Sequence, residues 1–175
     1  VIVVGAGSGL EISSYAAEQG LGVAVVEQGP FGGTCLNRGC IPSKMLIHSA
    51  DVAETIKQSH LFGITAKITK TEWNKIVNRA NKFVDGEARQ IEHGNKHTKN
   101  ITVYKTTAKF TGHKLIQVGK ETITADKIFI AAGTRPSIPQ IKGLDKVRFI
   151  TSDEALRLKK QPKDKAVLAI GTIEN

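Results

Sequence analysis

The chain has 175 residues, of which 40% are hydrophobic and 23% are charged, and this composition excludes a disordered tail. Two cysteines are too few for a small secreted module held by disulfides, and no apolar run approaches the roughly 20 residues of a membrane helix. The basic residues behind the net charge of +9 are spread between Arg38 and Lys165, so we expect a solvated surface with neither a nucleic-acid nor a membrane partner.

The first thirty residues predict two buried strands joined by a helix. Residues 1–4 are a β-branched run that ends in a Gly-rich turn, residues 12–20 suit a short helix, and residues 22–27 are a second apolar run. Parallel strands need such a crossover. A Gly-rich turn lets backbone amides approach a pyrophosphate, and Glu27 is placed to accept hydrogen bonds from ribose hydroxyls.

The turn departs from the Gly-x-Gly-x-x-Gly fingerprint of dinucleotide-binding proteins. Gly5 and Gly7 fit, but Leu10 occupies the third position and Gly9 is an additional glycine. We therefore expect the helix to pack on the strand more loosely or in a rearranged way. A plain strand–helix turn remains the alternative.

Further elements follow in chain order. Residues 28–37 suit a loop, and helices with 3.6-residue apolar spacing are predicted from Pro42 and from about Thr71, where Thr71 and Glu72 supply start chemistry. After His97 the pattern changes to period two. The last predicted elements are an antiparallel meander of residues 101–103, 115–117 and 122–124, a buried strand at 127–131, a short helix at 152–158 and a strand at 165–170.

The only two cysteines, Cys35 and Cys40, lie five positions apart at the start of a predicted helix. In an ideal helix, residues with this spacing have Cα atoms about 8.6 Å apart, beyond the roughly 7 Å that a disulfide tolerates. A bridge therefore requires a locally distorted segment, which Asn37 and Gly39 permit. Two buried free thiols or half of a metal site are the alternatives. No histidine lies at ligand spacing from the pair, so we expect no metal site.

The run Gly32-Gly33-Thr34-Cys35-Leu36-Asn37-Arg38-Gly39-Cys40-Ile41-Pro42-Ser43-Lys44 resembles the redox motif of the flavin-dependent pyridine nucleotide–disulfide oxidoreductases. That family includes dihydrolipoamide dehydrogenase and glutathione, mercuric and mycothione reductases. The resemblance covers nearly the whole chain, and residues 131–136 resemble the family's second flavin-contacting motif.

The resemblance implies an α/β fold in which a parallel sheet with helices and a small antiparallel meander form a Rossmann-like FAD-binding domain. That domain, with its redox-active disulfide, would span residues 1–150 and be incomplete. Residues 151–175 would be a linker and the first strand of a truncated NAD(P)-binding domain. The chain opens inside one hydrophobic run and stops after another, so we expect a segment of a longer protein.

The same resemblance implies roles for individual residues. Cys35 would be the interchange thiol that attacks the substrate disulfide, and Cys40 the thiol that forms a charge-transfer complex with the flavin. Lys44 would lie near the reactive edge of the flavin ring. The residues expected to touch FAD are Gly5, Gly7 and Ser8 at the pyrophosphate, Glu27 at the ribose, Gly33, Thr34, Cys35 and Lys44 on the flavin side, and Ala108, Ala132 and Gly133 elsewhere along the cofactor.

The implied function is an FAD-dependent dithiol–disulfide oxidoreductase, most like dihydrolipoamide dehydrogenase. Electrons would pass between NAD(P)H, FAD, the Cys35–Cys40 pair and a small dithiol or disulfide. A mycothione- or glutathione-reductase-like enzyme is the alternative, and the turn at residues 5–10 leans toward the mycothione branch. A flavin- or nucleotide-binding module without disulfide chemistry is the alternative from another class.

The catalytic His–Glu pair that the family takes from a partner subunit has no match among the five histidines of this chain. We therefore expect this segment alone to be inactive. For the whole protein we expect a homodimer and a cytoplasmic location, where two thiols poised for exchange are usually catalytic.

Overall fold

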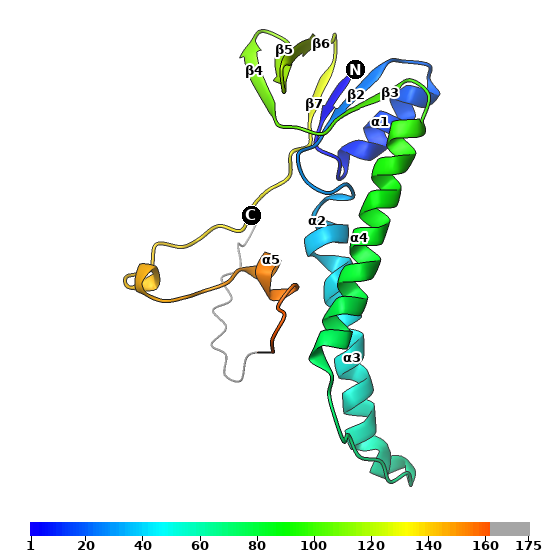
Figure 1. The fold of residues 1–175 in the computed structure, drawn as a ribbon, viewed down its shortest axis with the longest axis vertical. Helices are drawn as coiled ribbons and strands as arrows, with labels where there is room; N and C mark the ends of the chain where they lie inside the picture. Colours follow the sequence, from blue (N-terminus) through cyan, green and yellow to red (C-terminus); the bar gives the residue numbers. More distant parts are fainter. Residues whose placement is uncertain (162–175) are drawn as a thin grey trace.

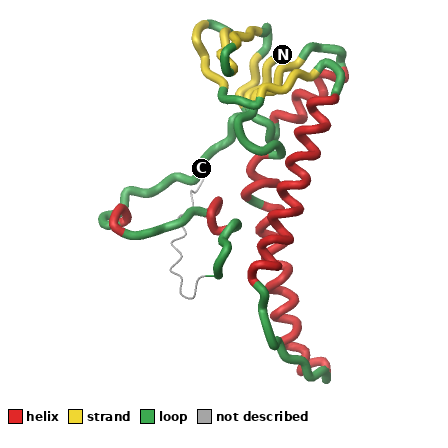
Figure 2. The backbone as a smooth tube through the Cα atoms, in the orientation of Figure 1, coloured by secondary structure: helices red, strands yellow, loops and turns green. Residues whose placement is uncertain are grey.

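The computed structural model of the chain describes residues 1–161. A four-stranded parallel sheet lies at one end, and long helices extend away from it (Figure 1 and Figure 2). Helix α1 (Gly9–Glu18) is the crossover between the two central strands, which confirms the predicted β–turn–α–β order. The strands stand in the order β3-β2-β1-β7, where β1 is Ile2–Val4, β2 is Val23–Val26, β3 is Ile101–Tyr104 and β7 is Ile128–Ile130.

Both faces of the sheet are covered. On one face, Val3 and Val25 pack with alanines of α1 and with Phe31, whose side chain is fully buried. On the other face, Ile2 and Val26 pack against the small antiparallel meander. Successive side chains of a strand point to opposite faces, so a strand that is covered on both sides is apolar without interruption. This is the physical origin of the continuous apolar runs in β1 and β2.

The meander consists of β4 (Ala108–Gly112), β5 (Leu115–Val118) and β6 (Glu121–Thr124), paired antiparallel in that order. The prediction that residues 101–103 belong to it is wrong, because β3 pairs in parallel with β2 in the main sheet. Ile101 and Val103 pack against the core while Thr102 is exposed, and this alternation produced the period-two pattern. Such a pattern shows that one face of a strand is buried, but it does not identify the neighbouring strand.

The strand predicted at residues 127–131 is present as β7, but its expected burial is wrong. Ile130 is 69% exposed and Phe129 is 38% exposed. Within residues 1–161, β7 pairs with β1 alone and lies at the edge of the sheet. The apolar run at residues 127–131 therefore predicted the strand correctly, but within residues 1–161 no element covers Phe129 and Ile130.

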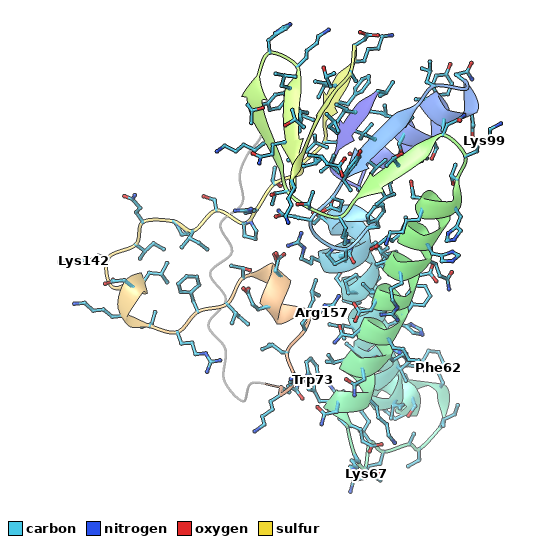
Figure 3. The ribbon with its side chains drawn as sticks, turned by 45° about the horizontal axis from the view of Figure 1, so that its top comes forward. Phe62, Lys67, Trp73, Lys99, Lys142 and Arg157 are labelled. Atoms are coloured by element: carbon cyan, nitrogen blue, oxygen red, sulfur yellow. The ribbon has the colours of Figure 1, made fainter. Side chains whose placement is uncertain are left out.

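Two long helices run side by side away from the sheet (Figure 1). Helix α3 (Cys40–Gln58) is followed by the turn η1 (Ser59–Phe62), and α4 (Trp73–His97) returns toward the sheet. The Arg79 guanidinium on α4 donates to Met45 O at 3.1 Å and to Ser49 Oγ at 2.8 Å on α3. Figure 3 shows Phe62 and Lys67 at the far end of this helical hairpin.

The starts of these helices differ from the sequence prediction. A short helix, α2 (Gly33–Arg38), occupies part of the predicted loop at residues 28–37, and α3 begins two residues before Pro42. Pro42 thus lies in the first turn of α3, where its missing N–H costs nothing. At α4, Glu72 is the N-cap but makes no capping bond. Its carboxylate pairs with Lys75 at 2.7 Å instead.

After β7 the chain leaves the sheet, passes through η2 (Leu144–Lys146) and returns to the helices (Figure 1). Helix α5 (Ser152–Ala155) is shorter than the predicted helix at 152–158. Thr151, its N-cap, forms a capping box at the start of the helix. Beyond it, Arg157 pairs with Asp85 of α4 at 2.8 Å, and the Trp73 indole donates to Leu158 O at 2.8 Å (Figure 3 labels Trp73 and Arg157). The strand predicted at residues 165–170 lies outside the described residues.

No helix within residues 1–161 has both the length and the apolar character needed to cross a membrane. Over the same residues, no three His, Cys, Asp or Glu side chains gather in a way that could hold a metal ion.

Candidate functional site

The first part of the site is the Gly-rich turn between β1 and α1. Gly5 has a φ of +107° and lies so close to Ala131 that a Cβ would come within 2.1 Å of the Ala131 carbonyl oxygen. The amides of Gly7 and Ser8 donate to no acceptor among residues 1–161. Unpaired amides at the start of a helix, together with the helix dipole, favour an anion. The turn is therefore suited to hold a phosphate group.

Gly9 provides the close helix–strand approach that the fingerprint assigns to its third glycine. A Cβ on Gly9 would lie 2.7 Å from Val3 Cγ1 and 3.0 Å from Ala131 Cβ. Leu10, at the fingerprint's own third position, is half-buried and packs against the core. We expected the helix to pack on the strand either more loosely or in a rearranged way. The structure shows a rearranged contact at Gly9, and the expectation of looser packing is wrong.

Glu27 lies at the end of β2 and binds the Gly-rich turn directly. Its carboxylate accepts hydrogen bonds from Ala6 N at 2.9 Å and from Gly29 N at 2.6 Å. A carboxylate offers about four lone-pair positions, so two remain for other donors. Glu27 is thus held beside the proposed phosphate position with capacity to accept from hydroxyl groups.

The loop that leads into α2 lies against the same turn. Gly32 N donates to Ala6 O at 2.7 Å. Gly33 has a φ of +66°, and a Cβ there would lie 2.7 Å from Gly7 Cα. The structure therefore brings together two segments, around Gly7 and Gly33, that the sequence analysis assigned to one cofactor.

Cys35 and Cys40 lie on either side of a break between two helices. Helix α2 ends at Arg38 and α3 begins at Cys40, so the expected local distortion is confirmed at Gly39. A Cβ on Gly39 would lie 3.0 Å from the Thr34 carbonyl oxygen and 3.3 Å from Cys35 Cα, so the backbone passes close to the first cysteine there. Both cysteines are free and exposed. A hydrogen bond to Cys40 favours the protonated thiol and raises the pKa of Cys35.

The remaining predicted site residues lie on the elements that meet at this place. Lys44 is exposed on α3, one turn after Cys40 on the same helix face, and Thr34 is exposed next to Cys35. Ala132 and Gly133 are the second and third residues after β7, with Ala132 N next to Gly5. Ala108 packs against the core cluster between the sheet and the meander, which includes Val26.

These residues gather at the carboxyl ends of parallel strands, where open α/β sheets bind their ligands. Figure 1 shows α2 and α3 continuing away from this edge of the sheet. A dinucleotide such as FAD fits this arrangement. The unpaired amides and the Glu27 carboxylate suit its pyrophosphate and ribose, and the loop at Gly33 leads directly to the thiols.

Two residues near the site make contacts that were not predicted. Lys105 lies over the Phe31 ring, 5.0 Å from its centroid, and pairs with Glu92 of α4 at 3.0 Å. These residues are far apart in the sequence, so no local signal could have revealed them. Asn37 is buried and donates to Phe31 O in the loop before α2 and to Gly33 O in the first residue of α2. A polar residue inside the cysteine motif was the available signal for it.

Helix α2 also contacts the segment that follows β7. The Arg38 guanidinium near the end of α2 pairs with the Asp153 carboxylate in α5 at 3.1 Å. Each charge lies at the helix end whose dipole favours it. The pair is solvent-exposed, and pairs of this kind contribute about 0–1 kcal/mol, so it connects the two segments without fixing them strongly.

Comparison with known proteins agrees with this geometry. Residues 1–172 match the family described as "Pyridine nucleotide-disulphide oxidoreductase". The chain is 36% identical to mycothione reductase from Mycobacterium tuberculosis over 181 residues, which cover 99% of this chain and 39% of that protein. It is 33% identical to a dihydrolipoyl dehydrogenase from Bacillus subtilis, in a match that covers 98% of this chain and 39% of that protein. The chain thus spans only about two fifths of these relatives.

The fold has a solved counterpart as well. The HOCl-induced flavoprotein disulfide reductase RclA from Escherichia coli matches with a TM-score of 0.75 and 28% identity, over 91% of this chain and 34% of that one. The α/β fold of the FAD-binding type is therefore confirmed. The family uses FAD with NAD(P)H as the electron donor, as the sequence resemblance implied. This chain belongs to the pyridine nucleotide-disulphide oxidoreductase family.

Proposed function

We propose that the whole protein is an FAD-dependent dithiol–disulfide oxidoreductase whose redox pair is Cys35 and Cys40. The observation that carries this proposal is the position of two free, exposed cysteines on either side of the helix break at Gly39, where the backbone lies close to Cys35 Cα, next to a loop that rests on the Gly-rich turn. Two thiols that meet at such a break can lose two electrons and two protons and join. The adjoining turn is suited to the cofactor that would accept those electrons.

Different residues are suited to hold different parts of FAD. Unpaired amides at Gly7 and Ser8 would bind the pyrophosphate, and the free lone pairs of Glu27 would accept from the ribose. When bound, FAD carries electron pairs between NAD(P)H and the thiols. The Lys44 ammonium would provide positive charge on the flavin side. Gly5, Gly33, Thr34, Cys35, Ala108, Ala132 and Gly133 would complete the contacts.

Exchange between the two thiols and a small disulfide needs no other oxidant or reductant. The Cys35 thiolate attacks one sulfur of a small disulfide, a mixed disulfide forms, and the first substrate thiolate leaves with a proton from solvent. The Cys40 thiolate then attacks the Cys35 sulfur and displaces the second substrate thiolate. The substrate gains two electrons and two protons, and the protein retains the Cys35–Cys40 disulfide. The reverse sequence oxidises a dithiol.

For the substrate, dihydrolipoamide chemistry is our first candidate and a mycothione- or glutathione-type disulfide is the second. The turn at residues 5–10 and the 36% identity to mycothione reductase favour the second, but the 33% identity to dihydrolipoyl dehydrogenase is close to it. Assays of NADH and NADPH with lipoamide, mycothione disulfide and glutathione disulfide distinguish these candidates.

We further propose the domain division at residues 1–150 and 151–175, a homodimer, and a cytoplasmic location. Exchange-competent thiols of this kind suit a reducing compartment. Size-exclusion chromatography coupled to light scattering tests the homodimer on the whole protein. A monomer at micromolar concentration would contradict it.

The proposal is tested by two-electron reduction of the FAD-loaded whole protein. A long-wavelength thiolate–flavin absorbance band is expected to appear. Cys40→Ser should abolish the band, because the sulfur beside the flavin is gone. Cys35→Ser should show the band before any reduction, because Cys40 then has no disulfide partner and its thiolate lies beside oxidised flavin. A band that survives in Cys40→Ser, or no band in the unmodified protein, would refute the assignment. Bound flavin with two freely titrating thiols under oxidising conditions would favour a flavin-binding module instead.

A further inference from the structure

Asn37 lies on α2 between the two cysteines, and its side chain is only 4% exposed. Its Nδ2 donates to Phe31 O at 2.8 Å and to Gly33 O at 2.9 Å. Its Oδ1 is buried and has no partner among the described residues. Exchanging the two ends of the amide would place an oxygen against two carbonyl oxygens, so the NH₂ group must face the loop. Every hydrogen bond of this side chain is therefore a donation.

One acceptor, Phe31 O, belongs to the loop that precedes α2, and the other, Gly33 O, belongs to the first residue of α2. Other contacts anchor both to the sheet. The Phe31 side chain is fully buried in the core with Ala6. Gly32 N donates to Ala6 O at 2.7 Å, and Gly33 lies against Gly7. The loop and the first residue of α2 are thus fixed to the Gly-rich turn. Asn37 provides the buried side-chain hydrogen bond from the second half of α2 to that loop.

Helix α2 packs beside α3 and α4, but within residues 1–161 it has few side-chain hydrogen bonds to other segments. It has six residues, and neither Gly32 at its start nor Gly39 at its end supplies a side-chain cap. Helices this short are unstable on their own. Among the described residues, the side-chain hydrogen bond from α2 to a segment far away in the sequence is the exposed Arg38–Asp153 pair. The orientation of Cys35, two residues before Asn37, therefore depends on the buried amide.

We propose that Asn37 is a positioning residue for the redox pair. Its amide holds α2 at the orientation in which the Cys35 thiol meets Cys40, and so sets the rate at which the pair forms and exchanges its disulfide. The inference rests on the proposed function of the two cysteines. Asn37 acts through the helix, since its hydrogen bonds go to Phe31 and Gly33 and not to the thiols.

The test is Asn37→Asp in the FAD-loaded whole protein. The substitution keeps the shape of the side chain but replaces its donors with an acceptor, which repels both carbonyls. We expect disulfide exchange with a small disulfide to slow by about 10- to 100-fold, the usual effect of a misplacement near 1 Å. The defect relative to the unmodified protein should shrink between pH 8 and pH 5, because protonation of the introduced carboxylate restores one donor.

The matched control is Asn95→Asp. Asn95 lies on α4, donates to Ile91 O at 2.9 Å and also has a buried Oδ1 without a partner among residues 1–161. The same chemical change there should lower the free energy of unfolding, measured with urea, and leave the exchange rate within about twofold of the unmodified protein. Asn37→Ser, which keeps one donor, provides a second variant if Asn37→Asp does not fold, and should show an intermediate rate.

The outcomes separate the two proposals. If the unmodified protein forms no reversible Cys35–Cys40 disulfide in a glutathione redox buffer, the proposed function fails. If that disulfide forms, but the folded Asn37 variants exchange as fast as Asn95→Asp does, the positioning role is wrong and the proposed function stands.

Discussion

Gly33→Ala tests whether the contact between Gly33, at the start of α2, and Gly7, in the Gly-rich turn, holds the site together. Gly33 combines two features that exclude a side chain. Its φ is +66°, and a Cβ would lie 2.7 Å from Gly7 Cα, a backbone atom that cannot rotate away. Alanine at this position must strain its own backbone and push the two segments apart.

The cost can be estimated from these two features. A non-glycine residue in the left-handed region costs about 1–2 kcal/mol. Carbon atoms prefer separations of about 3.5 Å or more, so the segments must move apart by about 0.8 Å, and such overpacking costs about 1–3 kcal/mol. The expected loss in the free energy of unfolding is therefore about 2–5 kcal/mol. The moved loop should also weaken FAD retention, because the Gly7 amide would no longer meet the pyrophosphate correctly.

Gly20→Ala is the matched control. Gly20 has a φ of +79°, but a Cβ added there would meet no atom within 4 Å, so it bears the backbone cost of about 1–2 kcal/mol alone. Urea unfolding of the whole protein, with bound flavin measured by absorbance after gel filtration, compares the two variants. If Gly33→Ala loses no more stability than Gly20→Ala and retains its flavin, the close contact does not hold the site.

Two further predictions concern ionisable groups. Cys40→Ala should lower the pKa of Cys35 toward its ordinary value of 9.0, because the thiol loses its hydrogen-bond partner. Iodoacetamide should then label Cys35 faster at pH 8 than in the reduced parent protein, as measured by peptide mass spectrometry, and a slower reaction would contradict this. Hydrogen bonds from Lys96 hold the pKa of Glu92 below its ordinary 4.5, with Lys105 assisting. Glu92→Gln should therefore cost about 1 kcal/mol at pH 7, and this difference should shrink as the pH falls below 4.5, because the parent carboxylate loses its charge when it is protonated. A difference that does not shrink in urea titrations as the pH is lowered would show that charge is not its cause.

Much of the fold follows from local patterns. The β-branched runs predicted β1 and β2 because strands covered on both faces are apolar throughout, and the helical stripes predicted α3 and α4 to within a few residues. The partner of β3 was assigned wrongly, because an alternating pattern records burial on one face and not the strand that lies beside it.

The candidate site divides in the same way. The spacing of Cys35 and Cys40 showed that a disulfide between them would require a break in the helix, and the structure has such a break at Gly39. The place of Asn37 was not evident, because its two acceptors are defined only once the loop has folded onto the turn. The shift of the close helix–strand contact to Gly9 likewise depended on where β7 brings Ala131.

The sequence by itself determined the chemistry of this protein: a Gly-rich turn, an acid at the end of the second strand, and a pair of cysteines in a family-specific motif. The tertiary structure decided how these parts meet, by placing the Glu27 carboxylate on Ala6 N and Gly33 against Gly7. The reason is physical. Residue types and spacing record local geometry, whereas contacts between segments far apart in the chain exist only after the strands have paired and the core has closed.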